Sequence, residues 1–149
     1  MAPIVSSVEI ARRPEEVFSY MTDTARLPEW QESLVSARAV GGDPRAVGSK
    51  VTQTRRVGRG ERTVTMETTE VSPPRSWASR GIDGPVRPIV KGAIDPVDGG
   101  ARSRVTIELD FEGHGIGKLL VPLMVRREAK NELPRNTQQL KERLEGGAS

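Results

Sequence analysis

The sequence contains no cysteine and a single histidine among its 149 residues. The absence of cysteine excludes disulfide bonds, thiol nucleophiles, cysteine-based zinc sites and iron–sulfur clusters. The one histidine, His114, cannot supply the two or three histidines that common catalytic zinc sites use. We therefore expect neither a metal site nor a cofactor.

The sequence also lacks a strong charge of one sign and a long apolar run. Basic residues number 23 and acidic residues 20, and aromatic residues make up only 3% of the chain. A nucleic-acid-binding protein would show a larger basic excess or more aromatic stacking platforms. The longest apolar run, 119–125, contains Pro122 and is far shorter than the roughly 20 residues of a membrane span. We expect no nucleic-acid partner and no transmembrane segment.

What the chain does contain fits a folded protein. Hydrophobic residues make up 35% of it and charged residues 29%, which is unlike a membrane protein or a disordered one. The length suits one compact domain, and no repeat, linker or low-complexity block divides it. We predict a single domain over residues 1–149. The N-terminus lacks the features of a targeting segment, so the expected location is cytoplasmic.

The first 30 residues predict one strand and two short helices. Residues 4–10 alternate between two faces, the pattern of a strand with one buried side. Pro14 suits the first turn of a short helix. A cap at Asp23 or Thr24 begins a second short helix that ends near Trp30.

The middle of the chain has the composition of β-structure, because glycine and proline turn signals separate short alternating segments. The last segment alternates most regularly, with Val105, Ile107, Leu109 and Phe111 on one face. Pro88 implies an edge, a bulge or an irregular start for its strand. The six predicted strands, antiparallel to one another, cover residues 34–40, 49–57, 61–71, 75–80, 86–94 and 102–112.

The final segment predicts a long helix. Apolar residues between Ile116 and Leu144 recur at steps of three and four, the spacing of one helix face. Pro134 lies in the interior, where proline removes a hydrogen bond. We expect it to kink the helix, or to end one helical segment and begin another.

This order of elements predicts an α+β fold. The sheet must bury its apolar face, and the long helix is the one element able to cover it. A curved antiparallel sheet of about seven strands, wrapped around one C-terminal helix, leaves a space between the two. Such a cavity suits an apolar ligand.

Three segments carry a resemblance to a known superfamily. They are residues 13–18 (RPEEVF) after the opening strand, residues 23–30 (DTARLPEW) and residues 140–145 (LKERLE). Over residues 4–145 the chain resembles the SRPBCC, or START-like, helix-grip superfamily, in its polyketide cyclase/dehydrase-like branch. The resemblance implies the helix-grip fold. It transfers no catalytic residues, because members of the superfamily bind or modify very different molecules.

The leading functional hypothesis is the binding of a small hydrophobic or aromatic molecule in this cavity. Tryptophan offers a large apolar surface with a polar N–H, and methionine offers an adaptable wall. The predicted ligand-binding residues are Trp30, Met66, Trp77, Leu109, Leu120 and Met124.

Two alternative functions stay open. One is a polyketide cyclase/dehydratase-like enzyme that acts on a hydrophobic substrate in the same cavity. It needs a polar group directed inward, and the catalytic candidates are His114, which titrates near neutral pH, and Arg80. Spacing from Trp77 favours a solvated Arg80. The other alternative is a partner-binding module with a filled core, with a homodimer as one possible assembly.

Two further motifs resemble binding sites, but each has a simpler structural interpretation. The arginines of residues 55–62 are interpreted as a solvated hairpin tip, with contact to acidic headgroups as the alternative. The alternating glycines from Gly113 to Gly117 partly mimic a phosphate-binding loop. They lack its spacing, and a flexible connection is the simpler interpretation.

Overall fold

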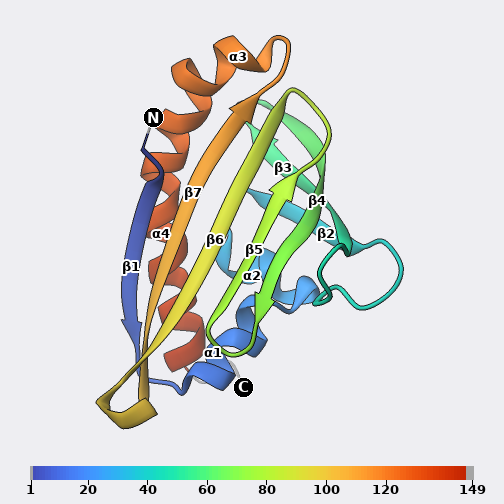
Figure 1. Ribbon diagram of the computed structural model, residues 1–149. Coiled ribbons are helices and arrows are strands. Elements are labelled where there is room, and N and C mark those ends of the chain that lie inside the picture. Colours follow the sequence, from blue (N-terminus) through green and yellow to red (C-terminus); the bar gives the residue numbers. More distant parts are fainter. Residues whose placement is uncertain (1, 147–149) are drawn as a thin grey trace.

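The protein, described here over residues 2–146 by a computed structural model, is built on one antiparallel sheet of seven strands (Figure 1). The strand order is β1-β7-β6-β5-β4-β3-β2, so the first and last strands of the chain are neighbours and β2 forms the far edge. The strands are β1 (Ile4–Ile10), β2 (Leu34–Ala39), β3 (Lys50–Val57), β4 (Gly60–Ser72), β5 (Ser76–Gly81), β6 (Val86–Val97) and β7 (Arg102–Gly113). The predicted seven-stranded α+β architecture is confirmed.

Two irregularities bend the sheet. The pairing register shifts between Leu34 and Ser36, where β2 meets β3, and between Thr68 and Glu70, where β4 meets β5. An extra residue in one strand increases the local twist and bends that strand. The sheet consequently curves, and a helix lies along its inner face (Figure 1).

The strand β6 is longer than the sequence pattern predicts. It runs past residue 94 to Val97, which pairs with Arg102 across the turn. Its pairing with β5 reaches only to Ile89. Pro88 therefore lies where β6 is paired on one side alone, in agreement with the edge position that was one of the predicted alternatives.

The helices follow the predicted order, with two short ones after β1 and a long one at the end. Pro14 occupies the first turn of α1, and the Asp23 carboxylate accepts a hydrogen bond from Ala25 N at 3.2 Å to cap the next turn. The helical elements are α1 (Pro14–Met21), the 3₁₀ turn η1 (Thr24–Arg26), α2 (Leu27–Trp30), the 3₁₀ turn η2 (Asp98–Gly100), α3 (Gly117–Leu120), the π-helical segment η3 (Val121–Val125) and α4 (Arg126–Glu145).

The expectation that Pro134 could end a helical segment is wrong. The helix α4 continues through Pro134 as one element, and Thr137 Oγ1 donates a hydrogen bond to Pro134 O at 3.0 Å. The change in helix type lies earlier, in η3, which contains Pro122. A π-turn holds an extra residue and shifts which side chains face inward.

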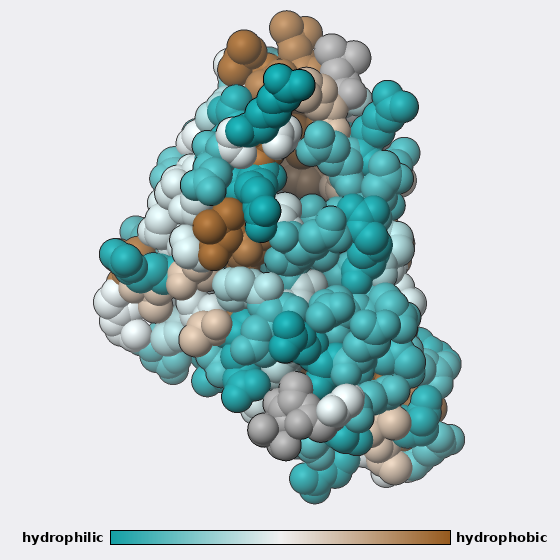
Figure 2. Space-filling view, turned by 180° about the vertical axis from the view of Figure 1, so that it is seen from behind, coloured by the Kyte–Doolittle hydropathy of each residue, from teal (hydrophilic) through white to brown (hydrophobic). Residues whose placement is uncertain are grey.

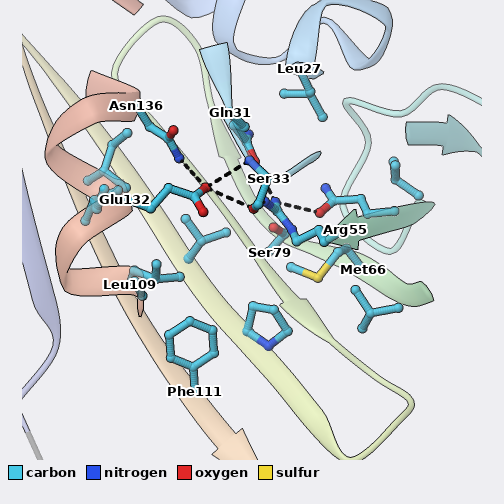
Figure 3. A pocket seen from close by; sticks show the side chains of 18 of the residues that line it. Leu27, Gln31, Ser33, Arg55, Met66, Ser79, Leu109, Phe111, Glu132 and Asn136 are labelled. Atoms are coloured by element: carbon cyan, nitrogen blue, oxygen red, sulfur yellow. Dashed lines mark hydrogen bonds between the residues drawn. The ribbon is translucent and has the colours of Figure 1, made fainter. Parts of the chain in front are cut away.

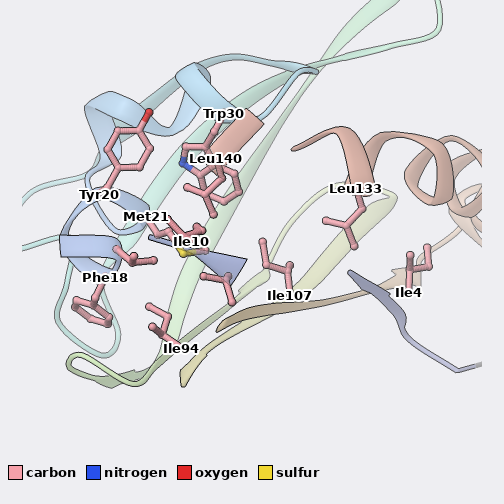
Figure 4. Close-up of a cluster of buried hydrophobic side chains, with 12 residues drawn as sticks. Ile4, Ile10, Phe18, Tyr20, Met21, Trp30, Ile94, Ile107, Leu133 and Leu140 are labelled. Atoms are coloured by element: carbon pink, nitrogen blue, oxygen red, sulfur yellow. The ribbon is translucent and has the colours of Figure 1, made fainter. Parts of the chain in front are cut away.

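The hydrophobic core fills one end of the space between sheet and helix (Figure 4). Leu140 on α4 is completely buried, in one cluster with the buried Ile10 and Ile107 of the sheet. Side chains of α1 and α2, among them Met21 and Trp30, close this end. The core fixes the C-terminal half of the helix against the sheet, and at its N-terminal end the buried Arg126 pairs with Asp110 of β7.

Polar contacts join α4 to β1 and to the residue that follows it, beside this core. The hydroxyl groups of Ser6 and Thr137 are 2.8 Å apart and hydrogen bonded. At the C-terminal end of α4, the Glu145 carboxylate accepts a hydrogen bond from Ala11 N at 2.7 Å and pairs with Lys141 at 2.8 Å. These two donors lower the pKa of Glu145. They set the position of the helix along the first strand.

Replacing Leu140 with alanine tests this packing. We expect Leu140→Ala to lower the free energy of unfolding by about 2–5 kcal/mol, because the lost side chain leaves a cavity in the core. The control is Leu119→Ala, whose side chain is 65% exposed and which should change stability by less than about 0.5 kcal/mol. Chemical denaturation followed by circular dichroism measures both variants. Equal stability of the two variants would contradict this description of the core.

Candidate functional site

A cavity of about 380 Å³ lies between the curved sheet and α4 (Figure 3). Its lining includes the exposed Arg56, Arg62 and Glu128, so it opens to the surface at that end. Figure 2 shows the surface hollowed below the apolar side chains at the top of the molecule, where α3 lies in Figure 1. At the other end, Trp30 and Leu133 belong both to the core and to the cavity wall. The core therefore closes the inner end of the cavity.

The sheet side of the cavity is mainly apolar. Alternate residues of neighbouring strands face it, and the register places Ser79 beside Val90 and Val90 beside Leu109. The apolar lining residues of β4 to β7 include Val64, Met66, Trp77, Val90, Leu109 and Phe111. This wall is the continuous apolar surface that a hydrophobic ligand needs.

One glycine lets Trp77 lie flat on this wall. Trp77 on β5 pairs with Gly92 on β6. A Cβ atom at Gly92 would be 2.4 Å from Trp77 Cε2, closer than any van der Waals contact allows. The indole ring therefore occupies the space that a side chain at residue 92 would fill, and any larger residue must displace it.

The helix side of the cavity carries two stripes at four-residue steps. Val125, Ala129 and Leu133 form an apolar stripe, and Glu128, Glu132 and Asn136 form a polar stripe beside it. Residues four apart share one face of an α-helix, which explains both stripes. The cavity is thus apolar along its sheet wall and partly polar along its helix.

A polar cluster joins the helix to the sheet across the cavity (Figure 3). Arg55 on β3 donates to Gln31 Oε1 at 2.5 Å, to Gln53 Oε1 at 3.0 Å and to Ser33 Oγ at 3.3 Å. Ser33 in turn donates from its hydroxyl to Glu132 Oε2 at 2.9 Å. Ser33 therefore connects the cation on the sheet with the carboxylate on α4.

The carboxylate of Glu132 has its own set of donors. Besides Ser33, Asn136 Nδ2 donates to Glu132 Oε2 at 2.9 Å. The other end of the Asn136 amide accepts a hydrogen bond from Glu32 N at 2.9 Å. Glu132 is consequently held by neutral groups and not by a direct ion pair with Arg55.

The electrostatics of the cluster favour an added negative charge. Burial lowers the pKa of the Arg55 guanidinium, and the nearby Glu132 carboxylate acts in the opposite direction. The charged residues that line the cavity are Arg45, Arg55, Arg56, Arg62, Glu128 and Glu132. Arginines outnumber glutamates in this set, so the lining carries a positive excess.

Two indole N–H groups beside the cavity have no hydrogen-bond partner within the described residues. They belong to Trp30 and Trp77, and both nitrogen atoms are buried. Buried polar groups are almost always paired, and leaving one unpaired costs free energy. Both side chains line the cavity. The two nitrogen atoms themselves have almost no accessible surface, so they are packed within the cavity wall.

The structure brings together four of the six predicted ligand-binding residues. Trp30, Met66, Trp77 and Leu109 line the cavity. Leu120 and Met124 are outside the lining, and Met124 is 47% exposed. The reason is the helical phase, because Val125 faces the cavity in place of Met124. Ligand binding at the four lining residues stays a prediction.

Neither predicted catalytic candidate reaches the cavity. Arg80 lies on the outer face of β5, where it pairs with Glu67 at 3.4 Å. His114 is partly exposed and is hydrogen bonded to Glu112, outside the cavity lining. The glycine at residue 117 has a packing role here, since a Cβ atom there would lie 1.8 Å from Pro85 O. This close approach fixes the start of α3 against the loop before β6.

Sequence reasoning missed the polar cluster, although a signal for it exists. Interpreting Arg55 as part of a solvated hairpin tip is wrong, because it lines the cavity at the end of an alternating series with Val51 and Gln53. On the helix, Glu132 lies four residues before Asn136, so the two side chains share one helix face. Arg55, Ser33 and Glu132 meet only through tertiary packing, so no local motif marks them.

No cluster that could hold a metal ion occurs among the residues that the structure describes. The helices of the described chain are too short or too polar for any of them to cross a membrane.

Together the fold and cavity define a START-like helix-grip protein. The chain belongs to the family described as "Polyketide cyclase / dehydrase and lipid transport", whose profile matches residues 1–145. A comparison with curated proteins finds no match.

Solved structures show the same fold. A START superfamily protein from Mycobacterium smegmatis is 15% identical with a TM-score of 0.79, and the match covers 98% of this chain and 99% of that one. The protein TTHA0849 from Thermus thermophilus is 17% identical with a TM-score of 0.78, covering 99% of both chains. The di-domain ARO/CYC BexL from the BE-7585A biosynthetic pathway is 14% identical with a TM-score of 0.73, covering 95% of this chain and 46% of that one.

Replacing Gly92 with alanine tests the placement of Trp77. We expect Gly92→Ala to displace the indole, to change the tryptophan emission spectrum and to lower the free energy of unfolding by about 1–3 kcal/mol. The control is Gly60→Ala, because a Cβ atom there has no neighbour within 4 Å. An unchanged spectrum and a stability equal to that of the control would show that Trp77 lies elsewhere.

Proposed function

We propose that this protein binds a small hydrophobic or aromatic molecule in the cavity between the sheet and α4. The observation that carries the proposal is a 380 Å³ cavity with a continuous apolar wall on β4 to β7. This volume lies within the range of small-molecule sites in proteins. The family description, which names cyclase/dehydrase activity and lipid transport, supports the same class of ligand.

The driving force for binding is the removal of apolar ligand surface from water. At about 25 cal/mol per Å², burying roughly 200 Å² of ligand contributes about 5 kcal/mol before the cost of ordering the ligand. The core fixes α4 without any ligand, so the protein does not need to fold around the ligand. A largely preformed cavity reduces the ordering cost on the protein side.

A cyclase/dehydratase-type reaction is the second candidate function, and the polar cluster favours it. Such a reaction needs a group that transfers protons and a group that stabilises negative charge on an oxygen atom. Glu132 would supply the first and Arg55 the second, since both line the cavity. His114 and Arg80 take no part in this candidate because they lie outside it.

The third hypothesis, a partner-binding module with a filled core, has less support. It requires that side chains fill the space between sheet and helix. The structure instead has a cavity there, so the geometry favours a small molecule as the partner.

Filling the cavity tests the proposed function. N-phenyl-1-naphthylamine, an uncharged probe that fluoresces in apolar surroundings, should bind the protein at a stoichiometry of about one. Ser79→Phe places a ring in the cavity and should weaken binding about tenfold or more, because the ring occupies ligand space.

The control for this experiment is Thr52→Phe on β3. Thr52 lies between the inward-facing Val51 and Gln53 and is outside the cavity lining. The Thr52→Phe variant should bind the probe with the affinity of the unmodified protein. Equal binding by Ser79→Phe and Thr52→Phe would place the probe outside the cavity and contradict the proposal.

A further inference from the structure

Arg55 is a charged group whose hydrogen-bond partners are all neutral. Its guanidinium donates to two glutamine side chains and one serine hydroxyl. Within residues 2–146 no carboxylate lies within 4.0 Å of it. Arginine keeps its positive charge in proteins, and a guanidinium is suited to a planar, two-oxygen acceptor. The cation thus lies in the cavity wall without a direct ion pair, although the Glu132 carboxylate is near enough to act on its pKa.

Glu132, the nearest candidate anion, is directed to other partners. Its Oε2 atom accepts hydrogen bonds from Ser33 and Asn136. Ser33 separates it from Arg55, as Figure 3 shows. The arrangement therefore keeps the helix carboxylate at a distance and leaves the guanidinium beside the open space of the cavity.

The charge of the rest of the lining also points to an anionic ligand. Arg56 and Arg62 lie at the exposed end of the lining. A purely hydrocarbon ligand would leave the Arg55 guanidinium in the cavity wall without an anion, and enclosing an unpaired charge costs free energy.

We propose that the ligand is a hydrophobic acid, whose apolar body lies along the wall of β4 to β7 and whose ionised carboxylate binds Arg55. This inference rests on the proposed function and names its ligand class. The carboxylate supplies the missing anion, and the arginines at the open end attract it from solution. Ser33 lies beside the same position, because its hydroxyl contacts both Arg55 and Glu132.

A pair of probes of nearly equal shape tests this inference. 1-Naphthaleneacetate carries an ionised carboxylate, and 2-(1-naphthyl)ethanol replaces that group with a neutral alcohol. Isothermal titration calorimetry at pH 7 should show about tenfold or more tighter binding of the acid, because hydrogen bonds to a charged group are stronger than neutral ones. Arg55→Gln should abolish this preference while changing the affinity for the alcohol by less than about threefold.

The control variant is Arg80→Gln, which removes the same charge from the outer face of β5, outside the cavity. It should keep the preference for the acid. A second measurement needs no variant, so it tests the inference even if Arg55→Gln does not fold. The affinity of the unmodified protein for the acid should fall as the pH drops below about 4.5, because the carboxylate of the acid takes up a proton. The affinity for the alcohol should not fall.

Each outcome is decisive. Equal binding of acid and alcohol by the unmodified protein, or a preference that survives in Arg55→Gln, overturns the inference and leaves the proposed function standing. If neither naphthyl probe nor the neutral amine probe binds, both fail. Loss of the preference in Arg80→Gln would show a general effect of net charge, and it too would overturn the role of Arg55.

Discussion

The packing of α4 against one end of a curved sheet is the interaction on which the rest of this structure depends. Leu140 and Leu133 fix the helix near α1 and α2, and the contacts of Thr137 and Glu145 with β1 set its position along the sheet. Towards its N-terminal end the helix faces the cavity instead of the core. The same two elements therefore provide both a close-packed core, which gives stability, and an unfilled volume, which is the proposed ligand site.

Two features of the cavity wall lose packing or ion pairing and gain accessible surface in return. A glycine at residue 92 removes a side chain so that an indole can cover the sheet, which gives a flat apolar surface at the cost of local strand packing. Arg55 and Glu132 are both kept inside but are separated by Ser33. A direct ion pair would satisfy both charges internally. The observed arrangement leaves the cation without an ion pair, at a cost in desolvation that the proposed acid would offset.

Much of the fold is predictable from the sequence, because periodicity and turn residues act locally. The alternation in residues 102–112 and the proline at the start of α1 place those elements correctly. The phase of the C-terminal helix is not predictable in this way, since a π-helical segment precedes α4 and Val125 faces inward where Met124 was expected. The polar cluster is harder to predict, because Arg55 and Glu132 are far apart in sequence and come close only when α4 packs on the sheet.

The central claim is that the cavity holds a small amphipathic molecule, and mass spectrometry of the intact protein tests it most directly. Protein purified without added ligand and then incubated with 1-naphthaleneacetate is measured under native and denaturing conditions. We expect the native spectrum to show a discrete added mass, either a retained cellular molecule or the acid, that is lost on denaturation. A native mass equal to that of the bare chain, before and after incubation, would contradict the claim.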